Sequence, residues 1–272
     1  MTLSHWLKLE YKALFKFKAI VQPPFNLTGR RILVAGASAG IGASTAILLS
    51  KLGAQVVLHG RDLKRLNEVL DQLSGKGHFI SAFDLNQLDE VPSWLKGVIC
   101  AERPLDGIAY CVGVQTTIPV RNFSTKHFDL VMHTNLGSAL ALTRGFRQRG
   151  CHNPGASMVL VSSIGGLIGQ PGNVVYGASK AGLMSAARGL AMELLRDDIR
   201  VNSVAPAMID TAMSRKAFSE MTEAQVEGIL KRHPMGMGKP EDVAGPIAFL
   251  LSDASRWING TNLTVDGGHM VG

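Results

Sequence analysis

Short apolar runs alternate with longer helical patterns along almost the whole chain, and this alternation constrains the fold more than any other feature. The runs predict strands at 32–35, 55–58, 79–83, 107–111, 157–162, 200–205 and 262–265. The segments between them predict helices at 41–52, 63–73, 88–100, 125–149, 174–196, 215–232 and 240–251. Such alternation is typical of parallel strands with helices on both faces. We therefore expect a single doubly wound α/β domain with a seven-stranded, mostly parallel sheet.

Polar or glycine-rich clusters follow each of the first six predicted strands. In chain order they read AGASAGIG, HGRD, FDL, CVG, SSIGG and APAMIDT. Ligands of such sheets bind beyond the carboxyl ends of the strands. The clusters therefore predict one binding site along that edge.

The first cluster, at 35–42, contains Gly36, Gly40 and Gly42. A strand, a glycine turn and a helix start together aim backbone N–H groups at one point, which suits a pyrophosphate. Glycines also let backbone approach closely and allow positive φ. The spacing differs from G-x-G-x-x-G, and a purely structural turn would use the same residues, so the turn alone does not decide.

Tyr176 and Lys180 lie four residues apart at the start of a predicted helix, so their side chains share one face within about 6 Å. A free tyrosine has a pKa of about 10. An ammonium about 5 Å away favours the phenolate by about 3 kcal/mol at an effective dielectric constant of about 20. Before any desolvation penalty, we expect Lys180 to lower the pKa of Tyr176, so that the phenol exchanges a proton near neutral pH. The alternative is a pair of surface side chains without chemistry.

Ser163 and Asn135 complete the candidate catalytic set. Ser163 ends the fifth predicted strand region and could polarise a substrate carbonyl as an oxyanion donor does; the alternative is a serine that only caps a turn. Asn135 stands inside the predicted helix 125–149, although asparagine is a poor helix former. Its side chain predicts either a functional contact or a local kink satisfied by backbone groups.

From about Leu27 to its end, the chain resembles the short-chain dehydrogenase/reductase family. Within that family it is most similar to 3-oxoacyl-carrier-protein reductases and related secondary-alcohol dehydrogenases. The resemblance rests on AGASAGIG, Asn135, Ser163, YGASK at 176–180, APAMIDT, and VDGG at 265–268. It implies a Rossmann-type domain over 27–272 with a lid at about 208–238.

The resemblance also implies a mechanism. Hydride passes between a nicotinamide cofactor and a carbonyl carbon, and Tyr176 acts as general acid or base. The serine-to-tyrosine spacing of the family selects Ser163 over its neighbour Ser162. Lys180 is implied to bind the nicotinamide ribose, and Asn135 to anchor a water that relays protons to Lys180. No metal is expected.

The cofactor type is read from the end of the second strand. NAD enzymes of this type usually carry an acid there, whereas this chain has Gly60 followed by Arg61. A missing carboxylate removes repulsion of a 2′-phosphate, and an arginine can pair with it. We therefore expect NADP(H) rather than NAD(H). The resemblance implies cofactor contacts from Gly36, Ser38, Gly40, Ile41, Gly42, Arg61, Asp84, Leu85, Val112, Gly113, Tyr176, Lys180, Ile209 and Thr211.

Two segments depart from the family pattern. Tyr110-Cys111-Val112-Gly113 stands where the family usually has Asn-Asn-Ala-Gly, and Pro206-Ala207 stands where it has Pro-Gly. Neither change touches a proton-transfer group, so we still expect an active enzyme. The alternatives are an NAD-dependent hydroxysteroid-type or polyol-type dehydrogenase and a non-catalytic nucleotide-binding scaffold or sensor. A scaffold need not keep all four catalytic groups.

The substrate is expected to be a ketone on an apolar chain or ring, such as a 3-oxoacyl group, rather than a free sugar. Apolar residues near Ser163 and methionines suited to irregular apolar ligands favour it; these are Ile164, Leu167, Ile168, Met208, Met213, Met221, Met235 and Met237. An acidic carrier protein would need basic residues at the mouth of the site. Arg144, Arg147 and Arg149 could supply them, whereas Asp197 and Asp198 would oppose such a protein, so the sequence leaves a carrier partner open.

The net charge of +7 is concentrated at the start of the chain, because residues 1–31 hold six Lys and Arg side chains against Glu10. This distribution argues against a nucleic-acid-binding protein, which would carry a basic stripe on its fold. We expect residues 1–26 to form a basic extension. Within it, 3–21 can form an amphipathic helix that contacts a membrane surface, a partner, or the chain's own domain.

Three cysteines without paired spacing argue against a disulfide framework or a zinc site and favour a reducing compartment. No apolar stretch reaches the length of a transmembrane helix. We therefore expect a cytoplasmic enzyme, with the extension as a candidate peripheral membrane contact. The family resemblance implies a dimer or tetramer.

Overall fold

The computed structural model describes residues 25–101 and 103–271. Within them, seven parallel strands form one sheet in the order β3-β2-β1-β4-β5-β6-β7. The strands are β1 (Arg31–Ala35), β2 (Gln55–Gly60), β3 (Phe79–Ala82), β4 (Leu105–Tyr110), β5 (His152–Val161), β6 (Ile199–Pro206) and β7 (Asn262–Val265). The prediction of an α/β fold with a seven-stranded parallel sheet is confirmed. The predicted helix 3–21 lies outside the described residues.

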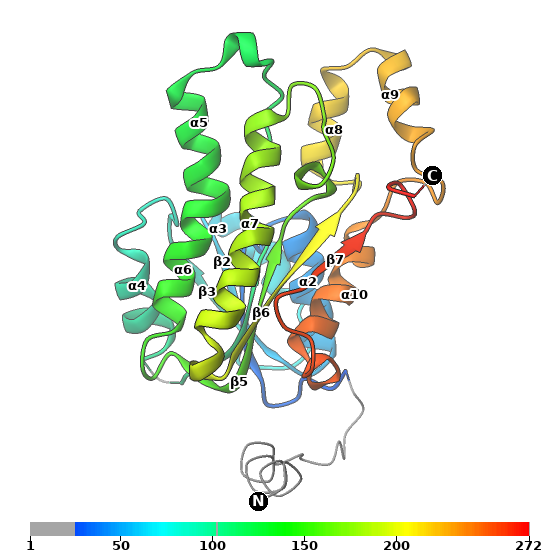
Figure 1. Ribbon diagram of the computed structural model, residues 1–272. Helices are drawn as coiled ribbons and strands as arrows, with labels where there is room; N and C mark the ends of the chain where they lie inside the picture. Colours follow the sequence, from blue (N-terminus) through cyan, green and yellow to red (C-terminus); the bar gives the residue numbers. More distant parts are fainter. Residues whose placement is uncertain (1–24, 102, 272) are drawn as a thin grey trace, which may run out of the picture.

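Helices cover both faces of the sheet (Figure 1). One face carries α2 (Gly40–Lys51), α3 (Leu63–Leu70) and α10 (Pro240–Leu251), and the other carries α4 (Val91–Trp94), α5 (Thr125–Met132), α6 (Ser138–Phe146) and α7 (Val174–Glu193). Two further helices, α8 (Ala212–Ser219) and α9 (Glu223–Leu230), lie beyond the carboxyl ends of the strands.

The central strand shows why the strands read as continuous apolar runs. In β1, Leu33 packs into the core on the α4–α7 face, while Ile32 and Val34 pack into the core on the α2–α10 face. All three side chains are at most 1% exposed. A strand that is covered on both faces gains from an apolar residue at every position.

The strand order places the expected site. The chain winds outward from β1 through β2 to β3, then returns to add β4 on the other side of β1. A crevice forms at such a reversal, outside the carboxyl ends of the strands. Because all strands are parallel, the six clusters that follow them lie along this same edge.

The predicted helix 125–149 is not continuous. A π-helical segment, His133–Gly137, separates α5 from α6. Asn135 lies in this segment and is fully buried. The sequence predicted an anomaly at Asn135, but a single helix was wrong, since π segments interrupt the regular i to i−4 hydrogen bonding.

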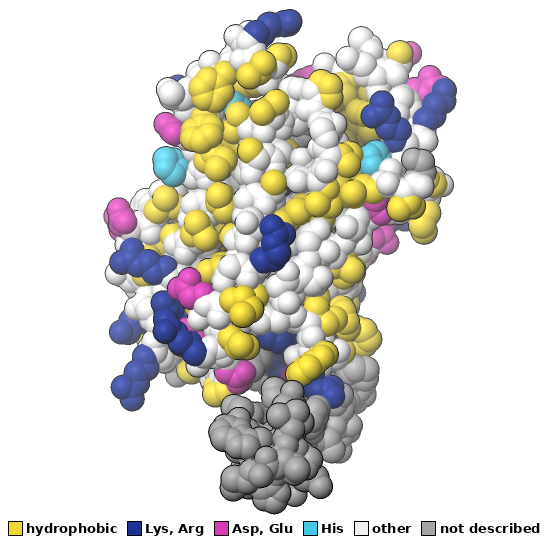
Figure 2. All heavy atoms as spheres, in the orientation of Figure 1, with side chains coloured by type: hydrophobic (Ala, Val, Ile, Leu, Met, Phe, Trp, Pro, Cys, Tyr) yellow, Lys and Arg dark blue, Asp and Glu magenta, His cyan; other side chains and the backbone are white. Residues whose placement is uncertain are grey.

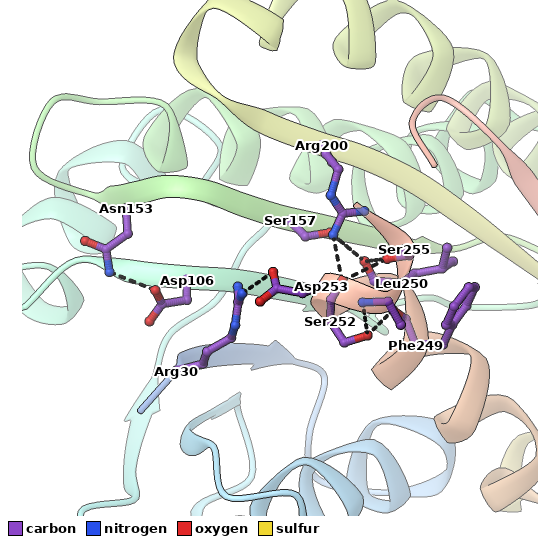
Figure 3. A network of polar contacts seen from close by, with 11 residues as sticks. Arg30, Asp106, Asn153, Ser157, Arg200, Phe249, Leu250, Ser252, Asp253 and Ser255 are labelled. Carbon is purple, nitrogen blue, oxygen red and sulfur yellow. Dashed lines mark hydrogen bonds and ion pairs between the residues drawn. The ribbon is translucent and has the colours of Figure 1, made fainter. Parts of the chain in front are cut away.

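The opposite, amino edge of the sheet is held by a polar network (Figure 3). The guanidinium of Arg200 donates to the carbonyls of Leu250 and Ser252 at 3.0 and 3.2 Å. These carbonyls end α10, where the helix dipole favours a cation. Ser157 donates to the same Leu250 carbonyl at 2.8 Å. The network joins β5 and β6 to α10 and thereby fixes the sheet edge remote from the site.

Arg147 and Arg149 also lie at the amino edge, because they fall between the end of α6 and the start of β5. Arg144 is in the last turn of α6. Arg147 pairs with Glu193 and Asp197 at 3.6 and 3.4 Å. A helix that runs antiparallel to the strands carries its last turn away from their carboxyl ends. The expectation that these arginines flank the mouth of the site is therefore wrong.

His59 gives the core a predicted pH dependence. Burial lowers its pKa from 6.5 to about 4, against a hydrogen bond to the Phe83 carbonyl that raises it. A shift of this size is worth about 3 kcal/mol. The unfolded chain binds a proton here below pH 6.5 while the folded chain does not. The stabilisation is therefore complete above pH 6.5 and is lost as the pH falls through about 4.

We expect His59→Gln to remove this part of the acid sensitivity. Between pH 7 and pH 4, the wild type should lose about 3 kcal/mol more of its unfolding free energy than the variant does. Denaturant titrations at several pH values measure it, and His133→Gln, at an exposed position, is the control. Parallel stability curves for wild type and His59→Gln would contradict this account.

Along the described segments, no helix is both long and apolar enough to cross a membrane. These segments also hold no group of three or more His, Cys, Asp or Glu side chains arranged to bind a metal ion.

Candidate active site

A cavity of about 340 Å³ opens at the carboxyl edge of the sheet, and α8 and α9 contribute to its wall. Ser163, Tyr176 and Lys180 all line it. Asn135 does not line it, but its side chain contacts the backbone of Val114 just behind the wall. The four predicted catalytic residues, from segments far apart in the sequence, thus gather at one place.

The glycine turn after β1 is too tight for side chains. A Cβ on Gly42 would lie 2.0 Å from the carbonyl oxygen of Gly36, and one on Gly36 would lie 3.0 Å from the Cys111 backbone. Gly36 and Gly40 also have φ values of +83° and +55°. The glycines let α2 begin directly against the strand ends.

The first turn of α2 is free to bind an anion. Its N-cap residue, Ala39, has no side-chain hydrogen bond to the helix. The N–H groups of a first turn have no partner within the helix, and with the helix dipole they favour a phosphate. The uncapped turn and the bare glycine cradle therefore fit the diphosphate of a dinucleotide.

The two serines after β5 have different surroundings. Ser162 is buried, and its hydroxyl donates to the Lys180 carbonyl at 2.7 Å. Ser163 lines the cavity, and its Oγ accepts from the Gly165 N–H at 3.1 Å. Both serines line the cavity, but the Ser162 hydroxyl already donates to a backbone carbonyl. These contacts favour Ser163, the serine expected from the family spacing, as the one that meets a ligand.

Tyr176 and Lys180 lie on one face of α7, with the Lys180 Nζ 5.8 Å from the centre of the tyrosine ring. Burial raises the pKa of Tyr176, and a hydrogen bond with Ser163 lowers it in part. The lowering expected from Lys180 did not include desolvation, and desolvation by burial sets the direction of the pKa in the protein chain alone. Removal of the phenolate from water outweighs the nearby cation.

Lys180 is buried, and its Nζ donates to the Val161 carbonyl at 2.9 Å. Burial lowers its pKa to about 8. Gly113 leaves room for this side chain, because a Cβ at that position would lie 3.2 Å from Nζ. The end of β5 and the loop after β4 thus enclose the lysine side chain, and its ammonium lies at the cavity wall.

Asn135 uses its side chain fully within the protein. Its Oδ1 accepts from the Val114 N–H at 2.8 Å, and its Nδ2 donates to the Val114 carbonyl and to Ser179 Oγ at 3.0 and 2.9 Å. These bonds tie the π segment to the loop after β4 and to α7. The relay water implied by the family remains a prediction.

Tyr110, where the family usually has asparagine, holds the same π segment from the other side. Its buried hydroxyl lies 2.7 Å from the Thr134 carbonyl and 2.6 Å from Ser138 Oγ. The Thr134 carbonyl, in the irregular turn, also accepts from Ser138 Oγ at 2.8 Å, so the three groups form one buried hydrogen-bonded cluster. Cys111, next to Tyr110, lines the cavity, but burial raises the pKa of its thiol to about 12. That value favours a packing residue over a reactive thiol.

The predicted cofactor residues form two groups along the edge. Ile41, Val112, Gly113, Ile209 and Thr211 line the cavity together with Lys180. Arg61, Asp84 and Leu85 do not line it and follow β2 and β3 instead. This division matches the reach of a dinucleotide from the cavity to the outer strands.

Arg61 is exposed and is 3.9 Å from the Asp84 carboxylate. The next acid, Asp62, caps α3 by accepting from the Arg65 N–H at 3.1 Å. The Arg61 side chain is 70% exposed despite the contact with Asp84, so its guanidinium can still meet an anionic group at this end of the site.

The predicted lid region, 208–238, contains α8 and α9. Each helix begins with a capping box, formed by Thr211 with Ser214 and by Thr222 with Gln225. The base is closed by a bridge between Ile209 and Gly238. Of the five lid methionines, Met208, Met213 and Met221 line the cavity, whereas Met235 is 84% exposed. Motion of this region remains a prediction.

The sequence reasoning missed the polar part of the cavity wall. Carboxamides from Gln115, Gln170 and Asn173, and cationic or imidazole groups from Arg232, His233 and His269, line it as well. None of these residues belongs to a motif. Their positions depend on how three loops and the lid fold toward each other.

Comparison with known proteins identifies the family. A family model described as Enoyl-(Acyl carrier protein) reductase matches residues 36–270. The chain belongs to the short-chain dehydrogenase/reductase family. It is therefore a member of a family of nicotinamide-dependent oxidoreductases, as the resemblance of its motifs implied.

Relatives in this family have different substrates. A 3-oxoacyl-[acyl-carrier-protein] reductase of Rickettsia conorii is 33% identical, over 90% of this chain and 99% of its own length. A solved structure from Sinorhizobium meliloti, assigned as a short-chain alcohol dehydrogenase, is 31% identical with a TM-score of 0.84, covering 91% of this chain and 99% of that one. A third, from Beutenbergia cavernae, is assigned as an NAD(P)-dependent gluconate 5-dehydrogenase with NADP bound at low occupancy. It is 29% identical with a TM-score of 0.83, covering 92% of this chain and 100% of that one.

Proposed function

We propose that the protein is an NADP(H)-dependent oxidoreductase that reduces a ketone to a secondary alcohol. The observation that carries this proposal is the convergence of Ser163, Tyr176 and Lys180 on one cavity, beside an uncapped helix start. A bound nicotinamide cofactor supplies the hydride. The protein's own groups then bind, orient and protonate the substrate.

Each catalytic group has one task in this proposal. Ser163 Oγ donates a hydrogen bond to the carbonyl oxygen, and Tyr176 transfers its phenolic proton to that oxygen. The raised pKa of Tyr176 keeps the phenol protonated at neutral pH, as a proton donor requires. Lys180 binds the nicotinamide ribose, and Asn135 with a water returns the proton.

In this proposal, the cofactor residues described above hold the dinucleotide along the carboxyl edge of the sheet. The first turn of α2 and the glycine cradle bind the diphosphate, and the loops after β4 and β6 enclose the nicotinamide end. Arg61 pairs with the 2′-phosphate. The NADP seen in the related structure from Beutenbergia cavernae supports this preference.

The type of ketone that serves as substrate is also part of this proposal. A 3-oxoacyl group or another apolar carbonyl compound is supported by the lid methionines and by the similarity to carrier-protein reductases. The alternative, an NAD-dependent secondary-alcohol dehydrogenase of polyol type, is favoured by the carboxamides of Gln115, Gln170 and Asn173 in the wall. A non-catalytic scaffold is disfavoured, since it would not need all four catalytic groups in contact.

Cofactor preference is the first test. We expect the wild type to bind NADPH more tightly than NADH, and Arg61→Ala to weaken NADPH binding about tenfold by loss of a charged hydrogen bond. NADH binding should not change. Nicotinamide fluorescence titrations measure both, with Arg65→Ala, an exposed arginine of α3, as the matched control.

The other outcomes of this titration are equally informative. NADH binding equal to or tighter than NADPH binding would shift the assignment to the NAD-dependent alternative. Tight binding of either cofactor without turnover of any ketone would favour a nucleotide-binding scaffold.

Self-association remains a prediction of the family resemblance. It is supported by apolar side chains that gather over α5 in Figure 2, where Phe123, Phe128 and Leu130 are 40–50% exposed. A cytoplasmic location and a membrane or partner contact through 3–21 also remain predictions.

A further inference from the structure

Part of the cavity wall is formed by Arg232, His233 and His269. Arg232 and His233 follow α9, and His269 follows β7. On the face seen in Figure 2, Lys, Arg and His side chains lie over α8 and α9. This part of the wall belongs to the lid and the chain end, so it is separate from the strand loops that carry the catalytic groups.

The cavity wall carries positive charge without a matching negative charge. Among the described residues that line it, Lys180 and Arg232 are cationic and none is Asp or Glu. No ion pair joins Arg232 to any acid in the described parts of the chain. Arg232 is exposed, so its guanidinium lies on the solvent side of the wall, where it attracts the anionic end of a ligand that enters the cavity.

Nearby acids are committed to other contacts. The Asp210 carboxylate binds the Arg215 guanidinium at 2.7 Å. The Asp266 carboxylate accepts the N–H groups of Gly268 and Met270 at 3.1 and 2.9 Å. Neither acid forms an ion pair with Arg232, and only the charge of Asp210 is balanced by another side chain.

His233 has a structural task that positions this cluster. Its Nδ1 bonds the Ile229 carbonyl at 2.8 Å, and its Nε2 accepts from the Met208 N–H at 3.4 Å. It joins the end of α9 to the loop after β6. His269 packs against it, with ring centres 4.5 Å apart and the ring planes tilted by 43°, and the buried His269 Nδ1 has no partner among the described residues.

We infer that the cavity takes an oxo acid, whose carboxylate is bound by Arg232 with His269 beside it. This inference rests on the proposed function, because the oxo group would lie at Ser163 and Tyr176. Between the two ends, Met213, Met221 and Ile229 contact the carbon chain. Arginine suits a carboxylate, since its planar donors can bind both oxygens.

The anion could also be the phosphate of a carrier's pantetheine arm. A carrier-linked substrate has a thioester in place of a free carboxylate, and its acidic protein would dock outside the cavity. The basic residues first expected to receive that protein lie at the opposite edge of the sheet. The free carboxylate is the simpler ligand, since it needs no carrier docked at the mouth of the cavity.

The test compares substrates that differ only in charge. The probes are 4-oxopentanoate, 5-oxohexanoate and 6-oxoheptanoate with their methyl esters, reduced with NADPH. We expect higher kcat/KM for at least one acid than for its ester. Arg232→Ala should raise KM for that acid about 10- to 100-fold, as loss of a charged hydrogen bond predicts, and leave the ester unchanged. Lys231→Ala removes a neighbouring exposed cation that does not line the cavity and should change neither.

Three outcomes would overturn the inference. Esters reduced as well as acids would exclude a carboxylate subsite. An equal loss for acid and ester in Arg232→Ala would assign the residue to lid structure. An effect of Arg232→Ala confined to a 3-oxoacyl pantetheine phosphate thioester would assign it to a carrier arm.

A binding measurement separates this inference from the proposed function. Calorimetric titration with hexanoate and with hexanamide needs no turnover. Tighter binding of hexanoate that is lost in Arg232→Ala supports the anion subsite even if no ketone is reduced. Equal binding of both compounds overturns it even if the enzyme proves to be an NADPH-dependent reductase.

Discussion

Tyr176→Phe is expected to lower kcat for ketone reduction about 1,000-fold and to leave NADPH binding almost unchanged. A positioned proton donor contributes about 100- to 10,000-fold, and the structure offers one phenol in contact with Ser163 at the cavity. The substitution removes the hydroxyl and keeps the aromatic ring of this α7 residue. Ser163 would still orient the carbonyl, but it would have no acid beside it.

Single-turnover kinetics with saturating NADPH separate the chemical step from binding. The control is thermal stability measured with and without NADPH, which should be close to that of the wild type. A kcat within tenfold of the wild type would exclude Tyr176 as the proton donor. A large loss of NADPH binding would instead assign the tyrosine to the cofactor site.

Ser163→Ala should show a different pattern from Tyr176→Phe. Ser163 Oγ accepts the Gly165 N–H and also lowers the pKa of Tyr176 through their hydrogen bond. Removal of the serine therefore withdraws an oxyanion donor and also raises the pKa of the remaining acid. This link between the two residues explains why their spacing in the sequence carried so much of the prediction.

The sequence predicted those parts of the fold that depend on local pattern. Apolar runs such as Ile32–Ala35 become strands because both faces of the sheet are covered, and the glycines at 36, 40 and 42 lie where backbone contacts leave no room. Ser163, Tyr176 and Lys180 could be found because a strand end and one helix face bring them together whatever the loops do.

Other features depended on contacts that no local pattern encodes. The π segment at 133–137 is stabilised by Tyr110, which lies at the end of β4. The helix pattern of 125–149 therefore gave no sign of the break. The net direction of the Tyr176 pKa could not be predicted, because the burial of the phenol was not known. His233 and His269 meet only because the lid and the segment after β7 fold together.

Among substitutions that add a single methyl group, Gly42→Ala is expected to disturb the binding site most. The new Cβ would lie 2.0 Å from the Gly36 carbonyl oxygen and 2.8 Å from its carbonyl carbon. Both are backbone atoms of the turn after β1, so no side chain can rotate away. Either α2 moves away from β1 or the turn changes shape, and each response displaces the uncapped helix start.

We expect the free energy of unfolding to fall by about 3 kcal/mol, the upper end for overpacking, and the Kd for NADPH to rise at least tenfold. Gly189→Ala is the matched control, because a Cβ there meets nothing within 4 Å and its position in α7 is exposed. Alanine in a helix interior should stabilise that variant by about 0.5–1 kcal/mol. Denaturant unfolding and NADPH titration of both variants measure these opposite signs. A Gly42→Ala protein with wild-type stability and NADPH affinity would show that the turn is not the close-packed cradle on which the proposed cofactor site depends.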